Sequence, residues 1–516
     1  MKNIYLLVKD IDVGRGGLTR VMLGRASYFA DAGHNCNLLS VTFKDRHDLI
    51  YDEFIRTKRL SKKVSLLNLF DYYREKNTIS EELSNDNKLL IQVKDRRYKI
   101  HSSELTTYRH VRYFDQDGRY IMYKKWHKNG HLQYIDYFKE DKTLYKKEEF
   151  CHNNYKTRTK YYDLVTKKLK METYHTPDGY AYLTIDYNLN NESPKMIYYL
   201  DRDSDEVVLF SQQDPMLQFQ KYWIEELCDK SHNKPFIINE DIFITDLFTK
   251  INKNKCYKIS TTHNNHLNAP YVIGSPVKKH YEDLFNKAGE LDAIVFLTKE
   301  QKEDVVSQFN FLKNVFAIPN ALSRIEFTET INKDLKVISI VGRLEYQKHL
   351  EDAIEAFSII SKKHKDVILN IYGKGPDEEK LQRLIKEKNL EKKIIIHGYT
   401  NSVGDVFKSS LFTIMTSRFE GSPMVLREAM LAGTCVISYD INYGPKDIIT
   451  NGEDGYLVRS GGINEMAEKM NELLTNPQKA IEMGNKAIIN ITEKFSEEKV
   501  MGMWFKLFDK IENMVR

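Results

Sequence analysis

The chain has 516 residues, a formal net charge of +5 and 41% hydrophobic residues, which is enough apolar material for two or three domains. No apolar run approaches the ~20 residues of a membrane span, and the apolar start at residues 4–8 is too short for a signal peptide. The cysteines are scattered without Cys-x-x-Cys spacing, which argues against a structural zinc site and favours a reduced, cytosolic protein: Cys36, Cys151, Cys228, Cys256 and Cys435.

The N-terminal segment has the order strand, glycine-rich loop, helix, strand that begins a Rossmann-like domain. Residues 3–8 and 37–43 are its apolar runs, and the loop between them contains Gly16 and Gly17. Glycines in such a loop let the backbone approach a ligand closely, although an ordinary turn is the alternative interpretation. The spacing differs from the Gly-x-Gly-x-x-Gly pattern of dinucleotide sites, so the sequence does not predict an NAD site.

From residue 101 to residue 200, short alternating apolar and polar runs are separated by Asp-Gly and Asn-Gly turns. This pattern predicts an antiparallel meander of hairpins. The segment is rich in tyrosine and lysine, including Lys124, Lys125, Lys128, Lys146 and Lys147. One interpretation is an ordinary sheet with a solvated lysine face, and the other is a basic aromatic surface for a polyanion or an oligomer contact.

Alternation of helix and strand then resumes, with strands predicted at residues 235–239, 258–261 and 294–298. The second of these strands is followed by a loop that holds His263 and His266. Two imidazoles at this spacing could bind zinc, but no third ligand lies nearby, so we do not expect a metal. We expect a histidine at the strand end to contact substrate, while a buried structural role is plausible for one of the pair.

A polar linker at residues 323–334 precedes a second Rossmann-like half with five predicted strands, at residues 337–341, 367–372, 394–397, 411–415 and 435–439. Its first loop places Arg343 and Lys348 at the mouth of a strand, where open parallel sheets bind ligands. Arginine offers a bidentate fork to phosphate and lysine a compact charge. Two solvated basic residues are the plainer alternative.

Residues 417–430 carry the strongest signal in the chain, a loop with Glu420 that leads into a helix with Glu428. We expect Ser422 to cap this helix and Pro423 to occupy its first turn, so that free N–H groups form an anion site. Carboxylates that accept hydroxyl donors beside an anion site suit a sugar nucleotide, whereas solvated surface carboxylates are the alternative. The last helix, residues 496–514, is amphipathic and either crosses back to the first half or packs locally.

These motifs resemble a known family. Val341-Gly-Arg-Leu with Lys348, and Glu420-Gly-Ser-Pro with Glu428, look like the signature of retaining glycosyltransferase family 4. One subgroup is similar in three further places, which are Asp12-Val13-x-x-Gly16-Gly17 with Thr19, His263-x-x-His266, and Asp440-x-x-Tyr443-Gly444-Pro445-x-Asp447. That subgroup contains wall teichoic acid alpha-glycosyltransferases and the protein O-GlcNAc transferases that modify serine-rich adhesins.

The resemblance implies an α/β GT-B fold, in which two Rossmann-like domains face a cleft and the N-terminal domain carries an antiparallel all-β insertion. The acceptor domain would comprise residues 1–100, 201–322 and 496–516. The insertion, residues 101–200, would serve the acceptor and oligomerisation, and residues 323–495 would bind the nucleotide sugar.

The resemblance also implies roles for matched residues. Arg343 and Lys348 would hold the diphosphate of a UDP-sugar and stabilise the leaving UDP, while Glu428 would bind the ribose. Glu420 would contact the donor sugar, with His263 beside the transferred sugar. The remaining nucleotide-site residues would be Gly16, Gly17, Tyr399, Gly421, Ser422 and Pro423. His349 stands where the wider superfamily often has glycine, so the shape of that loop is open.

The expected reaction moves glucose or N-acetylglucosamine from a UDP-sugar to poly(glycerol-phosphate) or poly(ribitol-phosphate), with retention and without a metal. The alternatives are a protein O-GlcNAc transferase and a non-catalytic partner of a transferase. We expect no nucleic-acid partner, a homotrimer built through the insertion, and a cytoplasmic location that allows proximity to the inner face of the membrane.

Overall fold

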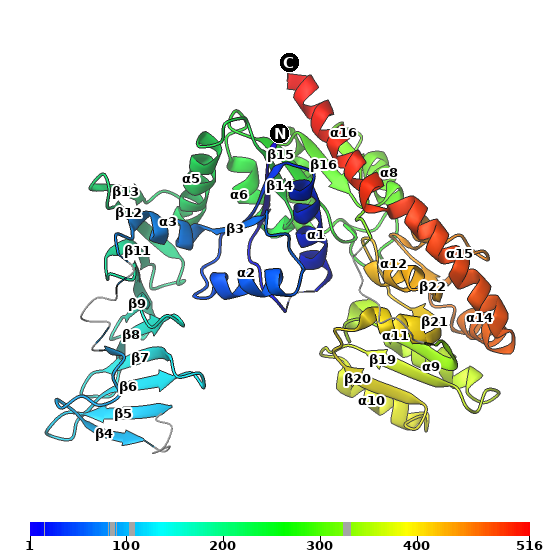
Figure 1. The fold of residues 1–516 in the computed structure, drawn as a ribbon, viewed down its shortest axis with the longest axis horizontal. Helices are drawn as coiled ribbons and strands as arrows, with labels where there is room; N and C mark the ends of the chain where they lie inside the picture. Colours follow the sequence, from blue (N-terminus) through cyan, green and yellow to red (C-terminus); the bar gives the residue numbers. More distant parts are fainter. Residues whose placement is uncertain are drawn as a thin grey trace.

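The protein consists of two lobes of parallel sheet and one long antiparallel sheet that extends from the first lobe, away from the second (Figure 1). The computed structural model describes residues 1–14, 16–80, 82, 88, 90–102, 109–322 and 332–515, so most of the predicted linker at residues 323–334 lies outside the described residues. The two predicted Rossmann-like halves and the antiparallel insertion are all present.

The first lobe is built on a seven-stranded parallel sheet with the order β17-β16-β15-β14-β1-β2-β3. The strands are β1 (Asn3–Val8), β2 (Asn35–Ser40), β3 (Ser65–Asn68), β14 (Phe236–Asn239), β15 (Tyr257–Thr261), β16 (Ala293–Phe296) and β17 (Val315–Ala317). The helices are α1 (Gly17–Asp31), α2 (His47–Arg56), α3 (Leu69–Asn77), α5 (Pro215–Asp229), α6 (Thr245–Lys250), α7 (Lys279–Asn286) and α8 (Lys299–Gln308). Every residue of the interior strand β1 is buried, as expected for a strand covered on both faces.

The antiparallel sheet has ten strands in chain order, each paired with the next. They are β4 (Lys99–Ser102), β5 (His110–Phe114), β6 (Tyr120–Trp126), β7 (Leu132–Phe138), β8 (Leu144–Phe150), β9 (Lys156–Tyr162), β10 (Leu169–His175), β11 (Ala181–Tyr187), β12 (Pro194–Asp201) and β13 (Glu206–Phe210). The sheet therefore runs beyond residue 200, the predicted end of the insertion. Its later strands share a core with α3 and α5, whereas β5, β6 and β7 form a small core of their own.

The second lobe is a six-stranded parallel sheet with the order β20-β19-β18-β21-β22-β23. The strands are β18 (Asp334–Val341), β19 (Ile368–Tyr372), β20 (Ile394–Gly398), β21 (Ser410–Met415), β22 (Cys435–Asp440) and β23 (Gly455–Arg459). The helices are α9 (Leu350–Ile360), α10 (Glu378–Glu387), α11 (Val403–Ser409), α12 (Met424–Leu431), α13 (Pro445–Ile448), α14 (Ile463–Thr475) and α15 (Pro477–Phe495). The first five strands were predicted within a few residues, and β23 was missed.

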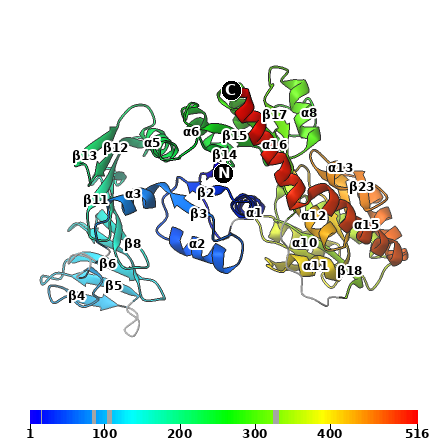
Figure 2. The ribbon, with the colours of Figure 1, turned by 45° about the horizontal axis from the view of Figure 1, so that its top comes forward.

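The last helix, α16 (Glu497–Val515), returns from the second lobe and packs against the first (Figures 1 and 2). The Trp504 ring lies edge-on to Phe29 of α1, with 6.3 Å between the ring centres. The Phe508 ring lies 4.5 Å from Phe236 of β14. Apolar residues spaced along one face of α16 thus complete the core beneath the first sheet.

Candidate active site

The predicted site residues lie in loops at the carboxyl ends of strands from both lobes. His263 follows β15 in the first lobe, Lys348 follows β18, and Glu420 follows β21 in the second lobe. Carboxyl ends of parallel strands are the usual ligand-binding edge of such sheets. The facing edges therefore define where the candidate site lies.

Lys348 and Glu420 form the centre of the second-lobe side. The Lys348 Nζ donates to Glu420 Oε1 at 2.6 Å, and the Gln347 Nε2 donates to Glu420 Oε2 at 3.1 Å. Both carboxylate oxygens are thus occupied, and the ammonium is held rather than free in solvent. His349 adopts φ 47°, a left-handed conformation that glycine adopts readily. The loop before α9 therefore has the backbone conformation that glycine would favour at this position.

His263 is held from the first-lobe side by a buried carboxylate. Its Nε2 lies 2.8 Å from Glu240 Oε2 and 3.0 Å from Thr261 Oγ1, while Arg25 pairs with the other oxygen of Glu240. Burial disfavours ionisation of Glu240, but Arg25 and the hydrogen bonds from His263 and Thr261 outweigh it and lower the pKa of Glu240 to about 2. A carboxylate that stays charged therefore fixes the orientation of the His263 ring.

His266 has a structural role instead. It is fully buried, and its ring stacks on that of Tyr443 from the second lobe, with 5.9 Å between centres. Burial lowers the pKa of His266 to about 4, so the ring is neutral near pH 7. The Tyr443 hydroxyl donates to Asp304 Oδ2 at 2.9 Å, so the Asp440–Asp447 motif of the sequence serves in part to join the lobes.

Gly421 brings the two sides together, because its backbone lies against the loop that carries His263. A Cβ placed on Gly421 would be 2.6 Å from the carbonyl carbon of His263 and 2.8 Å from the Cα of Asn264. Nearby, the Asn265 side-chain amide donates to the carbonyl oxygen of Asn442 at 2.9 Å. The structure thus places Glu420 and His263 on adjoining loops.

Glu428 and Arg20 form an ion pair across the lobes. Glu428 is buried on α12, and burial raises its pKa, although the Arg20 charge opposes the rise. Both residues line a cavity of about 730 Å³ between the lobes, together with Gly16 and Tyr399. A Cβ placed on Gly16 or Gly17 would meet no described atom within 4 Å, so open space lies beside this loop.

Arg343 is not brought into these contacts. Its side chain is 67% exposed, and its only ion-pair partner among the described residues is Glu345, at 2.8 Å. The expectation that Ser422 caps the helix is wrong. Helix α12 begins at Met424 after Pro423 and has no side-chain cap, while the Ser422 hydroxyl accepts a hydrogen bond from Arg427. The buried Arg427 guanidinium, which has no ion pair within 4 Å among the described residues, thus binds the oxygen that was expected to cap the helix.

Three of the lysines named from the sequence have partners within the protein. Lys124 is buried, and its Nζ donates to the carbonyl oxygen of Leu90 at 2.7 Å. Lys146 pairs with Glu148, and Lys147 with Asp136, each at 3.3 Å. The predicted solvated lysine face is therefore wrong for these three lysines: Lys124 is buried, and the side chains of Lys146 and Lys147 are only 23% and 22% exposed.

Sequence reasoning missed two residues, Arg20 and Glu240. Arg20 follows the glycine-rich loop by one helical turn, and that position is a usable signal. Glu240 directly follows a strand, but only the fold reveals that it contacts His263.

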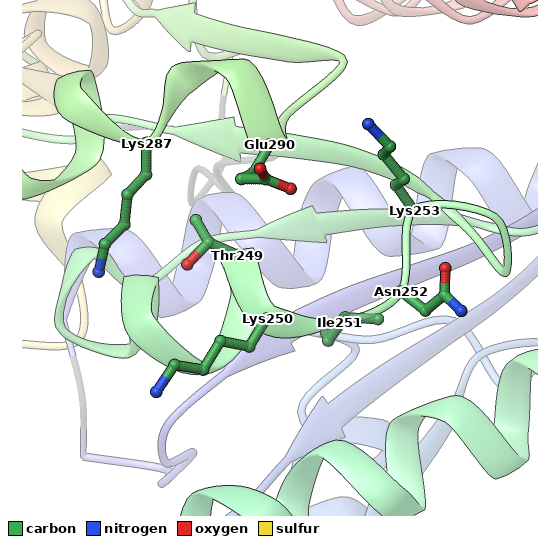
Figure 3. A pocket seen from close by; sticks show the side chains of 7 residues that line it. All are labelled: Thr249, Lys250, Ile251, Asn252, Lys253, Lys287 and Glu290. Carbon is green, nitrogen blue, oxygen red and sulfur yellow. The ribbon is translucent and has the colours of Figure 1, made fainter.

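A second hollow, of about 450 Å³, lies by α6 and α7 (Figure 3). Its wall includes Lys250, Lys253 and Lys287, whose side chains do not converge on one point. Lys287 pairs with Asp246 outside the hollow. Nothing in this hollow suggests a ligand. In the described part of the chain, no three His, Cys, Asp or Glu side chains cluster as metal ligands, and no helix has the length and apolarity to span a membrane.

Comparison with known proteins identifies the class. Residues 323–489 match the family of glycosyl transferases group 1. The structure of a Staphylococcus aureus TarM mutant in complex with fondaparinux, alpha-GlcNAc-glycerol and UDP superposes with a TM-score of 0.86 at 26% identity, covering 98% of this chain and 100% of that chain. The chain is therefore a glycosyltransferase with the predicted GT-B fold, and its second lobe is the group 1 domain.

Two relatives of known activity extend the similarity along the sequence. The poly(ribitol-phosphate) alpha-N-acetylglucosaminyltransferase of Staphylococcus aureus is 28% identical over 99% of this chain and 100% of its own length. The poly(glycerol-phosphate) alpha-glucosyltransferase of Bacillus subtilis is 25% identical over 98% of this chain and 75% of its own length.

Proposed function

We propose that the protein transfers glucose or N-acetylglucosamine from a UDP-sugar to hydroxyls of poly(glycerol-phosphate) or poly(ribitol-phosphate), the polymers of wall teichoic acid. The observation that carries this proposal is that 99% and 98% of the chain align with two enzymes named for these acceptors, the antiparallel sheet included. The fold alone would not select an acceptor, because this architecture hosts many reactions.

The nucleotide would occupy the cavity between the lobes. Glu428 would accept hydrogen bonds from the ribose hydroxyls, and Tyr399 would lie by the base. The open space beside Gly16 and Gly17 would admit the diphosphate. A cavity of about 730 Å³ lies within the range of about 300–1,000 Å³ that is usual for small-molecule sites.

Lys348 would provide most of the electrostatic stabilisation of the leaving UDP. Cleavage of the anomeric C–O bond builds negative charge on UDP, and a fixed ammonium stabilises that charge with little reorganisation. Arg343 would add a second cation by turning from Glu345 to the diphosphate, and the Gly421–Pro423 backbone would line the donor site. In this proposal the two basic side chains replace a metal, so activity should persist in a chelator such as EDTA.

Retention would follow from attack on the face that UDP leaves. Both Glu420 oxygens accept hydrogen bonds, from Lys348 and Gln347, which weakens this carboxylate as a nucleophile. A phosphate oxygen of the leaving UDP would take the proton of the acceptor hydroxyl. His263, oriented by Glu240, would contact the transferred sugar. Trapping a covalent sugar adduct on Glu420 would overturn this mechanism.

Assembly and location are part of the same proposal. The antiparallel sheet extends from the first lobe away from the second (Figure 2), and its edge strand β13 exposes Val207 and Leu209, at 60% and 52%. Such an edge suits contact with other copies in a homotrimer, which light scattering would test. The five cysteines are buried and form no disulfides, which suits the reducing cytoplasm. We place the protein there, with peripheral association at the inner face of the membrane.

The decisive experiment is mass spectrometry of products after purified protein meets mixed UDP-sugars and several acceptors. We expect one hexose per modified unit on a polyol-phosphate chain. A sugar found only on a serine-rich peptide would support the protein O-GlcNAc transferase instead. No transfer and no UDP release by folded protein would support a non-catalytic partner.

A further inference from the structure

Two guanidinium groups of the first lobe, those of Arg20 and Arg59, line the cavity between the lobes. Arg20 lies one turn into α1, and its backbone N–H donates to the carbonyl oxygen of Gly16 at 3.3 Å. Arg59 follows α2, donates from Nη1 to the carbonyl oxygen of Val13 at 2.9 Å, and lies 5.0 Å from the centre of the Phe54 ring. Both cations therefore lie beside the loop of Gly16 and Gly17, next to which there is open space.

Positive charge exceeds negative charge at this end of the cavity. Glu428 pairs with Arg20, whereas Arg59 has no carboxylate partner among the described residues. Burial lowers the pKa of Arg59, and the nearby charge of Arg20 lowers it further. Asp31 and Glu497 also line the cavity, where five basic residues face three carboxylates. Asp31 lies about 16 Å further along α1 than Arg20, at a rise of 1.5 Å per residue.

Entry of a nucleotide would change the partner of Arg20. Ribose hydroxyls are donors, so they can replace the guanidinium at the Glu428 carboxylate. Arg20 would then face Arg59 without a counter-charge, and two unpaired cations in a partly dry cavity repel each other. A diphosphate attached to the same ribose supplies the missing anion, and guanidinium groups bind phosphate in a bidentate manner.

We propose that Arg20 and Arg59 form an anion subsite for the nucleoside diphosphate on the first lobe, with Arg20 exchanging Glu428 for a phosphate oxygen when the nucleotide binds. This inference rests on the proposed function and adds to it. The diphosphate is then held from both lobes, by Arg20 and Arg59 on one side and Lys348 on the other. Nucleotide binding would thereby draw the lobes together through the phosphate rather than through Glu428.

The test is calorimetric titration of UDP and of uridine into the wild type and into Arg20→Ala and Arg59→Ala. We expect each variant to weaken UDP binding at least about tenfold, as loss of a charge-assisted hydrogen bond does. Uridine lacks phosphate, so its dissociation constant should change by less than about threefold. Arg56→Ala is the matched control, because Arg56 is 73% exposed, pairs with Glu53 and does not line the cavity.

Lysine variants control for loss of UDP binding that is caused by misfolding of the alanine variants. Arg20→Lys and Arg59→Lys keep the charge, so we expect UDP affinities between those of the wild type and the alanine variants. Equal losses for UDP and uridine would show that Arg20 merely ties the lobes and would overturn the inference. So would unchanged UDP binding in variants with wild-type melting temperatures. Both outcomes leave the proposed function intact, whereas a folded wild type that binds no UDP overturns that function itself.

Discussion

Gly421 lies so close to His263 that a side chain on the glycine would be 2.6 Å from the carbonyl carbon of the histidine. The two residues belong to different lobes, and their contact sets the spacing between the loops of Glu420 and His263. The atoms nearest to such a side chain are backbone atoms of His263 and Asn264, which cannot move aside as a flexible side chain would. The contact explains why a glycine follows Glu420 in this loop.

Gly421→Ala should therefore separate these loops. We expect kcat/KM to fall by more than about 100-fold, because small displacements of positioned groups are costly. Overpacking of this kind also costs about 1–3 kcal/mol of stability, measurable by urea unfolding. Gly502→Ala, on the open face of α16, is the control and should keep full activity. Normal turnover in Gly421→Ala would show that the loops tolerate a wider spacing.

Gly17→Ala should weaken UDP binding without lowering the stability of the protein. The new methyl group meets no described atom within 4 Å, and alanine favours the first turn of α1. Stability should therefore stay within about 1 kcal/mol of the wild type or improve. The methyl group would enter the space assigned to the diphosphate, so the dissociation constant of UDP should rise at least about tenfold. Unchanged UDP affinity would mean that the nucleotide lies elsewhere.

Lys348→Met should reduce catalysis more than donor binding. The variant removes the cation that faces Glu420 and the leaving UDP, so we expect kcat to fall by about 10²–10³-fold, as for other transition-state donors. Lys348→Arg keeps the charge at a different geometry and should retain part of the rate. Lys253→Met, on a distant surface, is the matched control. UDP release at the wild-type rate in Lys348→Met would contradict the proposed mechanism.

Glu240 should make the first lobe sensitive to acid. Its pKa is about 2 in the folded protein against an ordinary value of 4.5, so folding favours the ionised form. The stabilisation is fully present above about pH 4.5 and is lost as the pH falls towards 2; at 1.36 kcal/mol per pKa unit it amounts to about 3 kcal/mol.

Urea unfolding of the wild type and Glu240→Gln between about pH 6 and about pH 3 tests this contribution. The variant leaves the buried Arg25 without a counter-charge, so we expect it to be less stable by about 3–5 kcal/mol near neutral pH. The difference between the two proteins should shrink as the pH falls, because the unfolded wild type becomes protonated at Glu240 below about pH 4.5 and folding must then release that proton. A constant difference over this range would show that Glu240 does not titrate with folding.

Salt should weaken activity on a polymer acceptor. A polyol-phosphate chain carries one negative charge per unit, and its attraction to basic surfaces is screened as ionic strength rises. We expect kcat/KM for the polymer to fall at least about tenfold between about 0.05 M and about 0.5 M salt. A single polyol-phosphate unit is the control acceptor and should show a much shallower dependence. Equal salt dependence for both acceptors would count against an electrostatic track.

Much of the fold was accessible from the sequence because buried parallel strands are apolar runs. The strand at residues 3–8 was predicted with its observed ends. The β23 strand, Gly455–Arg459, was missed because it contains glycine and ends on a charged residue. In the antiparallel sheet, tyrosine and lysine alternate on half-buried faces, so periodicity indicated hairpins without fixing their number.

Parts of the site were less accessible for a physical reason. Lys348 and Glu420 stand in loops whose motifs indicate their chemistry, and the fold brings them together. Ser422 was expected to cap α12 because serine at a helix start usually does, but the buried Arg427 competes for its hydroxyl. Arg20 pairs with Glu428, 408 positions away, and Glu240 contacts His263, 23 positions away; local patterns do not identify such partners.

The return of α16 to the first lobe bears on how the chain matures during translation. Trp504 and Phe508 supply core contacts to Phe29 of α1 and Phe236 of β14, which are synthesised long before α16. Until α16 is synthesised, the apolar surface of the first lobe that it covers stays exposed, while the second lobe can already fold. Chaperone binding to that surface should end only when α16 emerges from the exit tunnel.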